Sequence, residues 1–231
     1  MRHLITPTDL TVDETLDILN LAERIRSNSK LYRHVADGRQ LATLFYEPST
    51  RTRLSFESAM LSLGGQTLGF SSADQSSATK GETVADTTRV ISCYADIIAM
   101  RHPKEGAPLR ASMYSKIPVI NAGDGGHAHP TQTMIDLMTI RQRKGRLDHL
   151  TIGFCGDLKF GRTVHSLVSS LVRFPENRFY FISPKELCIP DYMKTDVLAP
   201  SHSIYKEVFS LENTLPQLDV LYMTRVQKER F

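Results

Sequence analysis

The stretch Leu41-Ala42-Thr43-Leu44-Phe45-Tyr46-Glu47-Pro48-Ser49-Thr50-Arg51-Thr52-Arg53 decides the fold. Its first five residues form a short apolar run, which indicates a buried strand. Apolar side chains then recur at helical spacing up to Leu63, and Gly64-Gly65 ends the pattern, so we expect a helix over residues 50–63. The stretch therefore predicts a strand that passes through a short loop into the start of a helix.

The same alternation of strand and helix continues along the chain. Further strands are expected at residues 67–70, 96–100, 118–122, 151–155, 178–182 and 219–223, and further helices at 82–94, 131–143 and 162–172. Such alternation predicts parallel sheets with helices on both faces. We therefore expect an α/β protein with two doubly wound parallel-sheet domains, residues 1–145 and 146–231, divided at a charged stretch. The second domain is expected to be incomplete, because a covered sheet edge needs more chain than follows the last strand.

The loop after the first of these strands has the composition of an anion site. Ligands of open parallel sheets bind where the strands end, and the start of a helix offers free N–H groups and a favourable dipole. The side chains that can donate there are those of Ser49, Thr50, Arg51, Thr52 and Arg53. Helix capping with two solvated arginines would explain one hydroxyl, but not this density of donors. We therefore expect residues 48–53 to bind the phosphate of a small anionic substrate.

Two more polar segments follow expected strands of the first domain. Arg101 comes directly after a strand, where a substrate contact and a surface salt bridge are equally good explanations. His129 and Gln132 are three residues apart at a helix start, so they share a face. His127 and His129 could together hold a metal, but no carboxylate or cysteine stands at a helpful spacing, so no metal is expected.

The second domain contributes two arginines at corresponding strand ends. Arg162 lies in the segment 156–166, which follows a strand and opens a helix, and Arg225 follows the last strand. Either arginine alone would usually be structural, whereas the pair favours a ligand with two negative charges. The segment 156–166 lacks a G-x-G-x-x-G fingerprint, which disfavours a dinucleotide, and no cofactor is expected.

The overall composition excludes several classes of function. The 231 residues carry a formal net charge of +3 with scattered Lys and Arg, which is too weakly basic to indicate nucleic acid. No apolar stretch has membrane-spanning length, and the N-terminus lacks the apolar core of a signal peptide. Cys93, Cys155 and Cys188 are far apart and lie in apolar contexts, so we expect buried free thiols. These features predict a cytoplasmic protein with no nucleic-acid or membrane partner.

Taken together, the polar motifs resemble those of the aspartate carbamoyltransferases over essentially the whole chain. The matching segments are residues 45–57, 80–82, 100–103, 129–132, 156–166 and 224–230. Ser49-Thr50-Arg51-Thr52-Arg53 and His129-Pro130-Thr131-Gln132 are shared with the ornithine-specific sister family. Gly161-Arg162-Thr163-Val164-His165-Ser166 and Arg225-Val226-Gln227 are specific to the aspartate enzymes.

The resemblance implies an enzyme, a transferase of pyrimidine biosynthesis. It would move the carbamoyl group of carbamoyl phosphate to the α-amine of L-aspartate, giving N-carbamoyl-L-aspartate and phosphate. By resemblance, the phosphate would be held by Ser49, Thr50, Arg51, Thr52 and Arg101. The carbonyl oxygen would be polarised by Thr52, Arg101 and His129, the carbamoyl nitrogen oriented by Gln132, and L-aspartate held by Arg162, Arg225 and Gln227. Positioning and electrostatics would supply the acceleration without a cofactor.

The resemblance also implies a homotrimer, in which Ser76 and Lys80 reach into the site of a neighbouring subunit. From the sequence alone, Lys80 would be a solvated lysine of the Ser-rich loop 71–79. Thr79 stands where some relatives carry a second lysine, so that contribution is not expected here. Whether regulatory chains also bind is left open.

The relatives continue past Phe231 with the rest of the aspartate domain. If the chain ends at Phe231, we expect weak or no activity and an exposed sheet edge. A carbamoyl phosphate-binding relative without turnover is therefore one alternative. An ornithine carbamoyltransferase is another, although the acidic or sulfur-bearing pocket that a cationic acceptor would need is not evident in the sequence.

Overall fold

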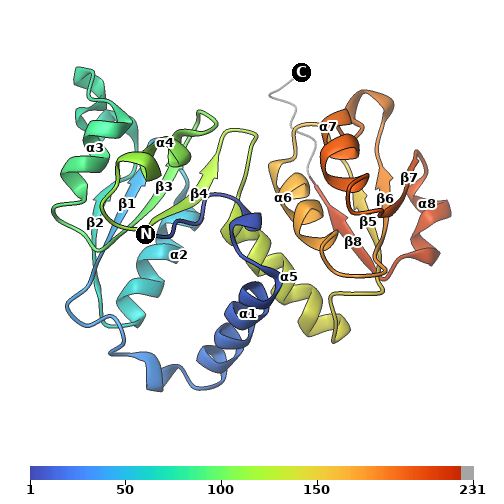
Figure 1. Cartoon of the computed structure of the whole chain (residues 1–231), viewed down its shortest axis with the longest axis horizontal. Coiled ribbons are helices and arrows are strands. Elements are labelled where there is room, and N and C mark those ends of the chain that lie inside the picture. Colours follow the sequence, from blue (N-terminus) through green and yellow to red (C-terminus); the bar gives the residue numbers. More distant parts are fainter. Residues whose placement is uncertain (225–231) are drawn as a thin grey trace. The chain divides into compact units, whose positions relative to one another are not determined.

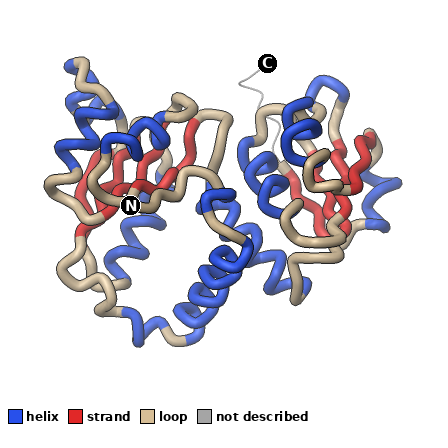
Figure 2. Tube along the Cα trace, viewed as in Figure 1, coloured by secondary structure: helices blue, strands red, loops and turns tan. Residues whose placement is uncertain are grey.

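The computed structural model describes residues 1–224, which fall into two compact units that meet between Thr131 and Gln132 (Figure 1). Each unit contains its own four-stranded parallel sheet with helices around it (Figure 2). The boundary between the units lies in the first turn of the continuous helix α5 (Pro130–Lys144), whereas the boundary expected from the charged stretch lies just after that helix ends. The predicted α/β fold with two parallel sheets is confirmed.

The sheet of the first unit has the strand order β2-β1-β3-β4. Its strands are β1 (Gln40–Phe45), β2 (Gln66–Phe70), β3 (Ile97–His102) and β4 (Val119–Asp124). The helices are α1 (Val12–Ser27), α2 (Thr50–Ser62), α3 (Val84–Ile91) and α4 (Ala107–Tyr114). The N-terminal segment joins the edge of this sheet, where Leu4 forms a parallel bridge with Ile120.

Both faces of this sheet are covered, as a doubly wound domain requires. Side chains alternate along a strand, so neighbouring residues of β1 enter different apolar clusters. Ala42 and Leu44 belong to the cluster that includes residues of α3 and α4. Leu41 belongs to the cluster that includes Met60 of α2. The two central strands are consequently buried, and their carboxyl ends are held rigidly.

The second sheet has the strand order β7-β6-β5-β8. Its strands are β5 (Thr151–Cys155), β6 (Arg178–Ile182), β7 (Ile204–Val208) and β8 (Val220–Met223), and its helices are α6 (Arg162–Leu171), α7 (Asp191–Met193) and α8 (Leu211–Thr214). The core is aromatic: Phe154 of β5 lies 5.9 Å from Phe181 and 5.6 Å from Tyr222, measured between ring centroids. This packing fixes β8 against the centre of the sheet.

Three sequence-based expectations need correction. The sequence analysis did not predict β7, α1 or α4. The helix expected at residues 82–94 spans only Val84–Ile91. The expectation of buried thiols was wrong, because Cys93 is exposed on the turn after α3 and Cys155 and Cys188 are half-buried. Within residues 1–224, no helix is both long and apolar enough to cross a membrane.

Candidate active site

The loop between β1 and α2 leaves its polar groups available. Ser49 is the N-cap residue of α2, and its hydroxyl makes no capping hydrogen bond to the helix. Arg51 is exposed and Thr52 is half-buried, both in the first turn, where backbone N–H groups have no partner within the helix. The capping alternative therefore does not account for this serine, and the first turn of α2 can receive an anion.

Parallel pairing brings Arg101 beside this loop. Arg101 of β3 is in register with Phe45 of β1, and the N–H of Tyr46 donates to the carbonyl oxygen of Arg101 across 2.9 Å. Its side chain is only 14% exposed, and Nη2 lies 2.6 Å from Glu47 Oε1. Among the described residues, the buried Nε has no hydrogen-bond partner. The guanidinium group is thus held at the strand ends with one donor unused.

Arg53 pairs with a carboxylate on its own helix. Its Nε donates to Glu57 Oε1 across 2.8 Å, one turn later on α2. The same carboxylate oxygen accepts from the hydroxyl of Thr43, at 2.9 Å, on β1. Arg53 therefore links the helix to the sheet, whereas Arg51 is exposed in the first turn of α2.

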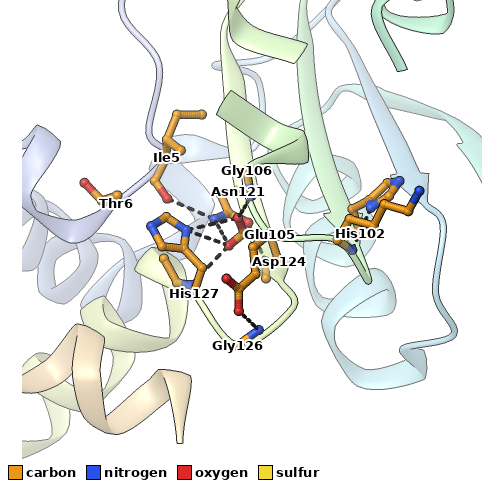
Figure 3. Close-up of polar contacts among 12 residues, drawn as sticks. Ile5, Thr6, His102, Glu105, Gly106, Asn121, Asp124, Gly126 and His127 are labelled. Atoms are coloured by element: carbon orange, nitrogen blue, oxygen red, sulfur yellow. Dashed lines mark hydrogen bonds and ion pairs between the residues drawn. The ribbon is translucent and has the colours of Figure 1, made fainter. Parts of the chain in front are cut away.

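A polar cluster at the end of β4 holds the turn that precedes His129, and Figure 3 shows its contacts around Asp124 and His127. The fully buried carboxylate of Asp124 accepts hydrogen bonds from Asn121 Nδ2 at 2.8 Å, from the N–H of Gly106 at 2.8 Å and from the N–H of Ala128 at 3.1 Å. His127 Nδ1 lies 3.0 Å from Asp124 Oδ2. His127 is thus a partner of Asp124, and the residues that the structure describes contain no group of three metal-ligating side chains.

The pKa values of this cluster follow from its contacts. Burial raises the pKa of Asp124, but the hydrogen bonds from His127, Asn121 and Gly106 outweigh burial, so the net pKa is lowered. The hydrogen bond to Asp124 raises the pKa of His127, against a smaller lowering by burial. Both shifts favour an ion pair that stabilises the turn.

His129 and Gln132 lie on either side of the start of α5. The side chain of His129 is buried just before the helix, with Nδ1 3.5 Å from the hydroxyl of Thr131. Gln132 is in the first turn, and its Nε2 donates to Asp136 Oδ1 across 2.9 Å. Within the first unit, the structure thus places Arg101 at the carboxyl end of β3, and Ser49, Arg51 and His129 after the carboxyl ends of β1 and β4.

Ser76 and Lys80 lie in a separate part of the first unit. The expected loop contains two short 3₁₀ helices, η3 (Ala73–Gln75) and η4 (Ser77–Lys80). The hydroxyl of Ser76 donates to the carbonyl oxygen of Ala73 at 2.8 Å and accepts from the N–H of Ala78 at 3.3 Å, so it caps η4. Lys80 is exposed, and Gly81 ends the segment with a φ of 89°.

In the second unit, the segments after β5 and β8 are tied together. The hydroxyl of Thr224 accepts from the N–H of Asp157 at 2.8 Å, and the N–H of Thr224 donates to the carbonyl oxygen of Cys155 at 2.8 Å. Arg162 opens α6 after this loop and is half-buried. Arg225 and Gln227, the other expected aspartate ligands, lie outside the described residues.

His165 of the same motif is structural. Its Nε2 lies 2.8 Å from the carbonyl oxygen of Leu158, and its Nδ1 lies 2.8 Å from the hydroxyl of Tyr192. The imidazole thus fixes the loop before α6 to the segment around α7, which positions the start of α6 and Arg162.

The comparisons with known proteins agree with this arrangement. A family model described as aspartate/ornithine carbamoyltransferase, carbamoyl-P binding domain, matches residues 2–142. A protein named aspartate carbamoyltransferase catalytic subunit, from Lachnoclostridium phytofermentans, is 67% identical over 231 residues, covering 100% of this chain and 75% of that protein. The chain belongs to the aspartate carbamoyltransferase family. The catalytic subunit of Clostridium acetobutylicum is 63% identical over 230 residues, with the same shares covered.

Solved structures of aspartate transcarbamoylases have the same fold. The catalytic subunit of the M. jannaschii enzyme superposes with a TM-score of 0.92 at 51% identity, covering 100% of this chain and 76% of that chain. The Trypanosoma cruzi enzyme in complex with N-(phosphonacetyl)-L-aspartic acid has a TM-score of 0.92 at 35% identity, covering 100% of this chain and 74% of that chain.

Three polar residues near the aspartate carbamoyltransferase motifs were missed by the sequence analysis. Glu47, the partner of Arg101, lies inside a quoted motif but was given no role. Asp136 stands four residues after Gln132, and this helical spacing could have suggested the contact. Tyr222 reaches Asp136 across 86 residues of sequence, for which the sequence carries no signal.

Proposed function

We propose that this chain transfers the carbamoyl group of carbamoyl phosphate to the α-amine of L-aspartate, giving N-carbamoyl-L-aspartate and phosphate. The observation that carries the proposal is the buried guanidinium of Arg101 beside the open first turn of α2, in a chain that is 67% identical to a named catalytic subunit. An arginine fork and a helix N-terminus together match the charge and geometry of a phosphate.

The phosphate is held by Ser49, Thr50, Arg51, Thr52 and Arg101 in this proposal. The amine nitrogen of L-aspartate bonds to the carbonyl carbon, the carbon–oxygen bond to phosphate breaks, and phosphate leaves with the electron pair and takes up the proton that the nitrogen loses. Thr52, Arg101 and His129 donate to the carbonyl oxygen as negative charge develops on it, and Gln132 orients the carbamoyl nitrogen. Removal of one such donor typically costs about 10²–10³ in kcat.

L-Aspartate is held by Arg162, Arg225 and Gln227, because two carboxylates need cationic or amide partners. The position of Arg162 at the start of α6, beside the segment that Thr224 ties to β5, supports this assignment. We also propose that residues 1–145 form the carbamoyl phosphate-binding domain and residues 146–231 the aspartate-binding domain. The family model of the carbamoyl-P binding domain, which matches residues 2–142, supports these limits.

The test compares acceptors. The purified protein is assayed with carbamoyl phosphate and either L-aspartate or L-ornithine, and both the carbamoylated product and phosphate are measured. We expect product with L-aspartate alone. Turnover with L-ornithine alone would overturn the assignment of Arg162, and tight binding of carbamoyl phosphate without turnover would support a binding-only protein.

We propose a homotrimer in which Ser76 and Lys80 complete a neighbouring subunit's site. The exposure of Lys80, at the end of a short helix that closes with a left-handed glycine, suits a side chain that reaches outward. Mixing inactive Arg51→Ala and Lys80→Ala subunits tests this, because hybrids contain some sites with neither substitution. Recovered activity supports sites that are shared between subunits. If the subunits are verified to exchange and no activity is recovered, shared sites are contradicted. A cytoplasmic location stays a prediction from the sequence.

A further inference from the structure

A chain of hydrogen bonds in the second unit holds the side chain of Gln132. Gln132 Nε2 donates to Asp136 Oδ1 across 2.9 Å, one turn later on α5. The hydroxyl of Tyr222, on β8, donates to the other oxygen, Oδ2, across 3.2 Å. Thr163, which follows Arg162 at the start of α6, is a further hydrogen-bond partner of Tyr222. Three elements therefore determine where the carboxylate of Asp136 lies.

The contacts of Asp136 define its charge. Burial raises the pKa of Asp136 above its ordinary value, and the hydrogen bonds from Gln132 and Tyr222, which stabilise the carboxylate, offset this rise only in part. Burial, followed by the charge of Asp136, raises the pKa of Tyr222 to about 12. The phenol consequently keeps its proton at neutral pH and acts toward Asp136 as a donor. In both printed contacts Asp136 is the acceptor, through Oδ1 from Gln132 and through Oδ2 from Tyr222.

An acceptor on one side of a carboxamide decides which way the carboxamide faces. Oxygen and nitrogen of a glutamine side chain are interchangeable in shape, so an isolated glutamine can present either one to a ligand. A carboxylate can pair only with the NH₂ group. Asp136 thus holds Gln132 Nε2, and Oε1 is left on the other branch of the carboxamide as an acceptor.

We propose that Asp136 is a positioning residue that fixes the carboxamide oxygen of Gln132 toward the ligand, and so makes the site select an acyl phosphate that carries an NH₂ group. This inference rests on the proposed function, in which Gln132 faces the carbamoyl nitrogen. Carbamoyl phosphate supplies an N–H donor to Oε1. Acetyl phosphate, with a methyl group in place of NH₂, leaves that acceptor unpaired, and sites built around a hydrogen bond reject such analogues strongly.

The test is the Asp136→Asn substitution, which preserves size but offers Gln132 either a carbonyl oxygen or an NH₂ group. Both orientations of Gln132 then become available. Phosphate release is measured with saturating L-aspartate and either carbamoyl phosphate or acetyl phosphate. We expect the ratio of kcat/KM for the two acyl phosphates to fall about tenfold, the value of one hydrogen bond, through a higher KM for carbamoyl phosphate.

Two controls separate positioning from general damage. Inorganic phosphate has no group that meets Gln132, so its affinity, measured by calorimetry, should change less than about twofold in the variant. Asp17→Asn makes the same chemical change at an exposed position of α1 and should leave the selectivity ratio as in the wild type. In a protein that already carries Gln132→Ala, Asp136→Asn should change the selectivity ratio by less than about twofold, because the side chain that Asp136 positions is gone.

Tyr222→Phe keeps the carboxylate and removes one of its donors, so it tests the same cluster if Asp136→Asn does not fold. We expect a smaller loss of selectivity in the same direction. An active variant with unchanged selectivity, or equal losses for carbamoyl phosphate, acetyl phosphate and inorganic phosphate, overturns the role of Asp136 alone. A wild type that neither binds nor converts carbamoyl phosphate overturns the proposed function, and this role falls with it.

Discussion

Arg51 and Arg53 stand two residues apart on one helix, yet the structure gives them different surroundings. Arg53 is held by Glu57, which also binds the hydroxyl of Thr43, whereas Arg51 is exposed in the first turn of α2. The sequence predicted the anion site from the density of donors, and the two guanidinium groups looked equivalent. Only the contacts of Glu57 separate them: its helical spacing from Arg53 could have suggested that ion pair, whereas its contact with Thr43 on β1 could not be predicted from a helix motif.

This difference gives a matched pair of substitutions. Arg51→Ala should lower kcat/KM for carbamoyl phosphate by about 10²–10³, because it removes a charge from the phosphate and the leaving group. Arg53→Ala should keep most of the activity and lower the free energy of unfolding by about 1 kcal/mol, because it breaks a partly exposed ion pair. Steady-state kinetics and urea denaturation measure the two effects. Equal kinetic losses would place Arg53 back among the ligands.

The pair of Asp124 and His127 should make stability depend on pH. The lowered pKa of Asp124 adds stability above its ordinary value of about 4, which is lost as the pH falls through the lowered pKa. The raised pKa of His127 adds stability below its ordinary value of about 6.5, which is lost as the pH rises through the raised pKa. The pair therefore contributes most between these two ordinary values.

His127→Gln checks this window. At pH 5.5 the substitution should lower the free energy of unfolding by about 0.5 kcal/mol, a small value because the imidazole is 42% exposed. At pH 8.5 the imidazole is mostly neutral, so the substitution should lower the free energy of unfolding by less, because only a neutral hydrogen bond is lost. Urea denaturation at pH 5.5 and at pH 8.5 measures this change in the free energy of unfolding. His34→Gln is the control, since that histidine pairs with Asp37 in solvent. A difference that grows with pH would contradict the assignment.

At the scale of elements, the sequence predicted two buried strands of the second sheet and missed its exposed edge strand. Residues 151–155 and 178–182 are apolar runs in the core of the second sheet, and both expected strands are confirmed at the same bounds. β7 was missed because most of Ile204–Val208 is exposed at a sheet edge and lacks a continuous apolar run. α3 begins later than expected because the hydroxyl of Thr83 caps it by accepting from the N–H of Asp86.

Long-range contacts explain why the site was only partly predictable. Arg101 could be placed at a strand end from its position after an apolar run. The residues that lie beside Arg101 could not be predicted in the same way, because the register of Phe45 with Arg101 depends on pairing between strands that are distant in sequence. The contact of Tyr222 with Asp136 has the same cause.

The loop after β5 has little room for a larger residue. Gly156 has a φ of 118°, and a Cβ atom there would lie 2.5 Å from the hydroxyl oxygen of Thr224. Gly156→Ala should therefore lower the free energy of unfolding by about 3 kcal/mol, combining backbone strain with overpacking. Gly145→Ala is the control: its φ is 75° and, within residues 1–224, no atom other than those of its chain neighbours lies within 4 Å of the added Cβ, so only the strain of about 1 kcal/mol applies.

Thermal and urea denaturation of both glycine variants measure this difference. Gly156→Ala should also raise the KM for L-aspartate, because the same loop leads to Arg162. Equal destabilisation of the two variants would mean that Thr224 can move away from the added methyl group without a cost in stability.

At the scale of the whole molecule, the two units have separate sheets and separate cores, and the proposed ligands divide between them. Carbamoyl phosphate is assigned to side chains of the first unit, apart from Gln132, and L-aspartate to the second. A ligand that binds only the folded chain stabilises it, by about 2.7 kcal/mol at one hundred times its dissociation constant.

Hydrogen exchange can locate this stabilisation. Carbamoyl phosphate alone should slow exchange in residues 46–53 and around His129, since those backbone groups face the proposed phosphate. The edge strand β7 should exchange at its ligand-free rate and serves as the internal control. Uniform slowing across residues 1–224 would instead indicate that the ligand acts on global stability alone.

The pairing of β5 with β8 also has a consequence for the order in which the chain can fold during synthesis. The first sheet needs only residues up to Asp124, so it can close while the rest is still being translated. Thr151–Cys155 must wait for Val220–Met223, because Ile152 pairs with Val220. In that interval the middle strand of the second sheet has one open side. Parallel pairing over such a sequence separation is slow, which makes this the period when the nascent chain is most exposed to aggregation and to chaperones.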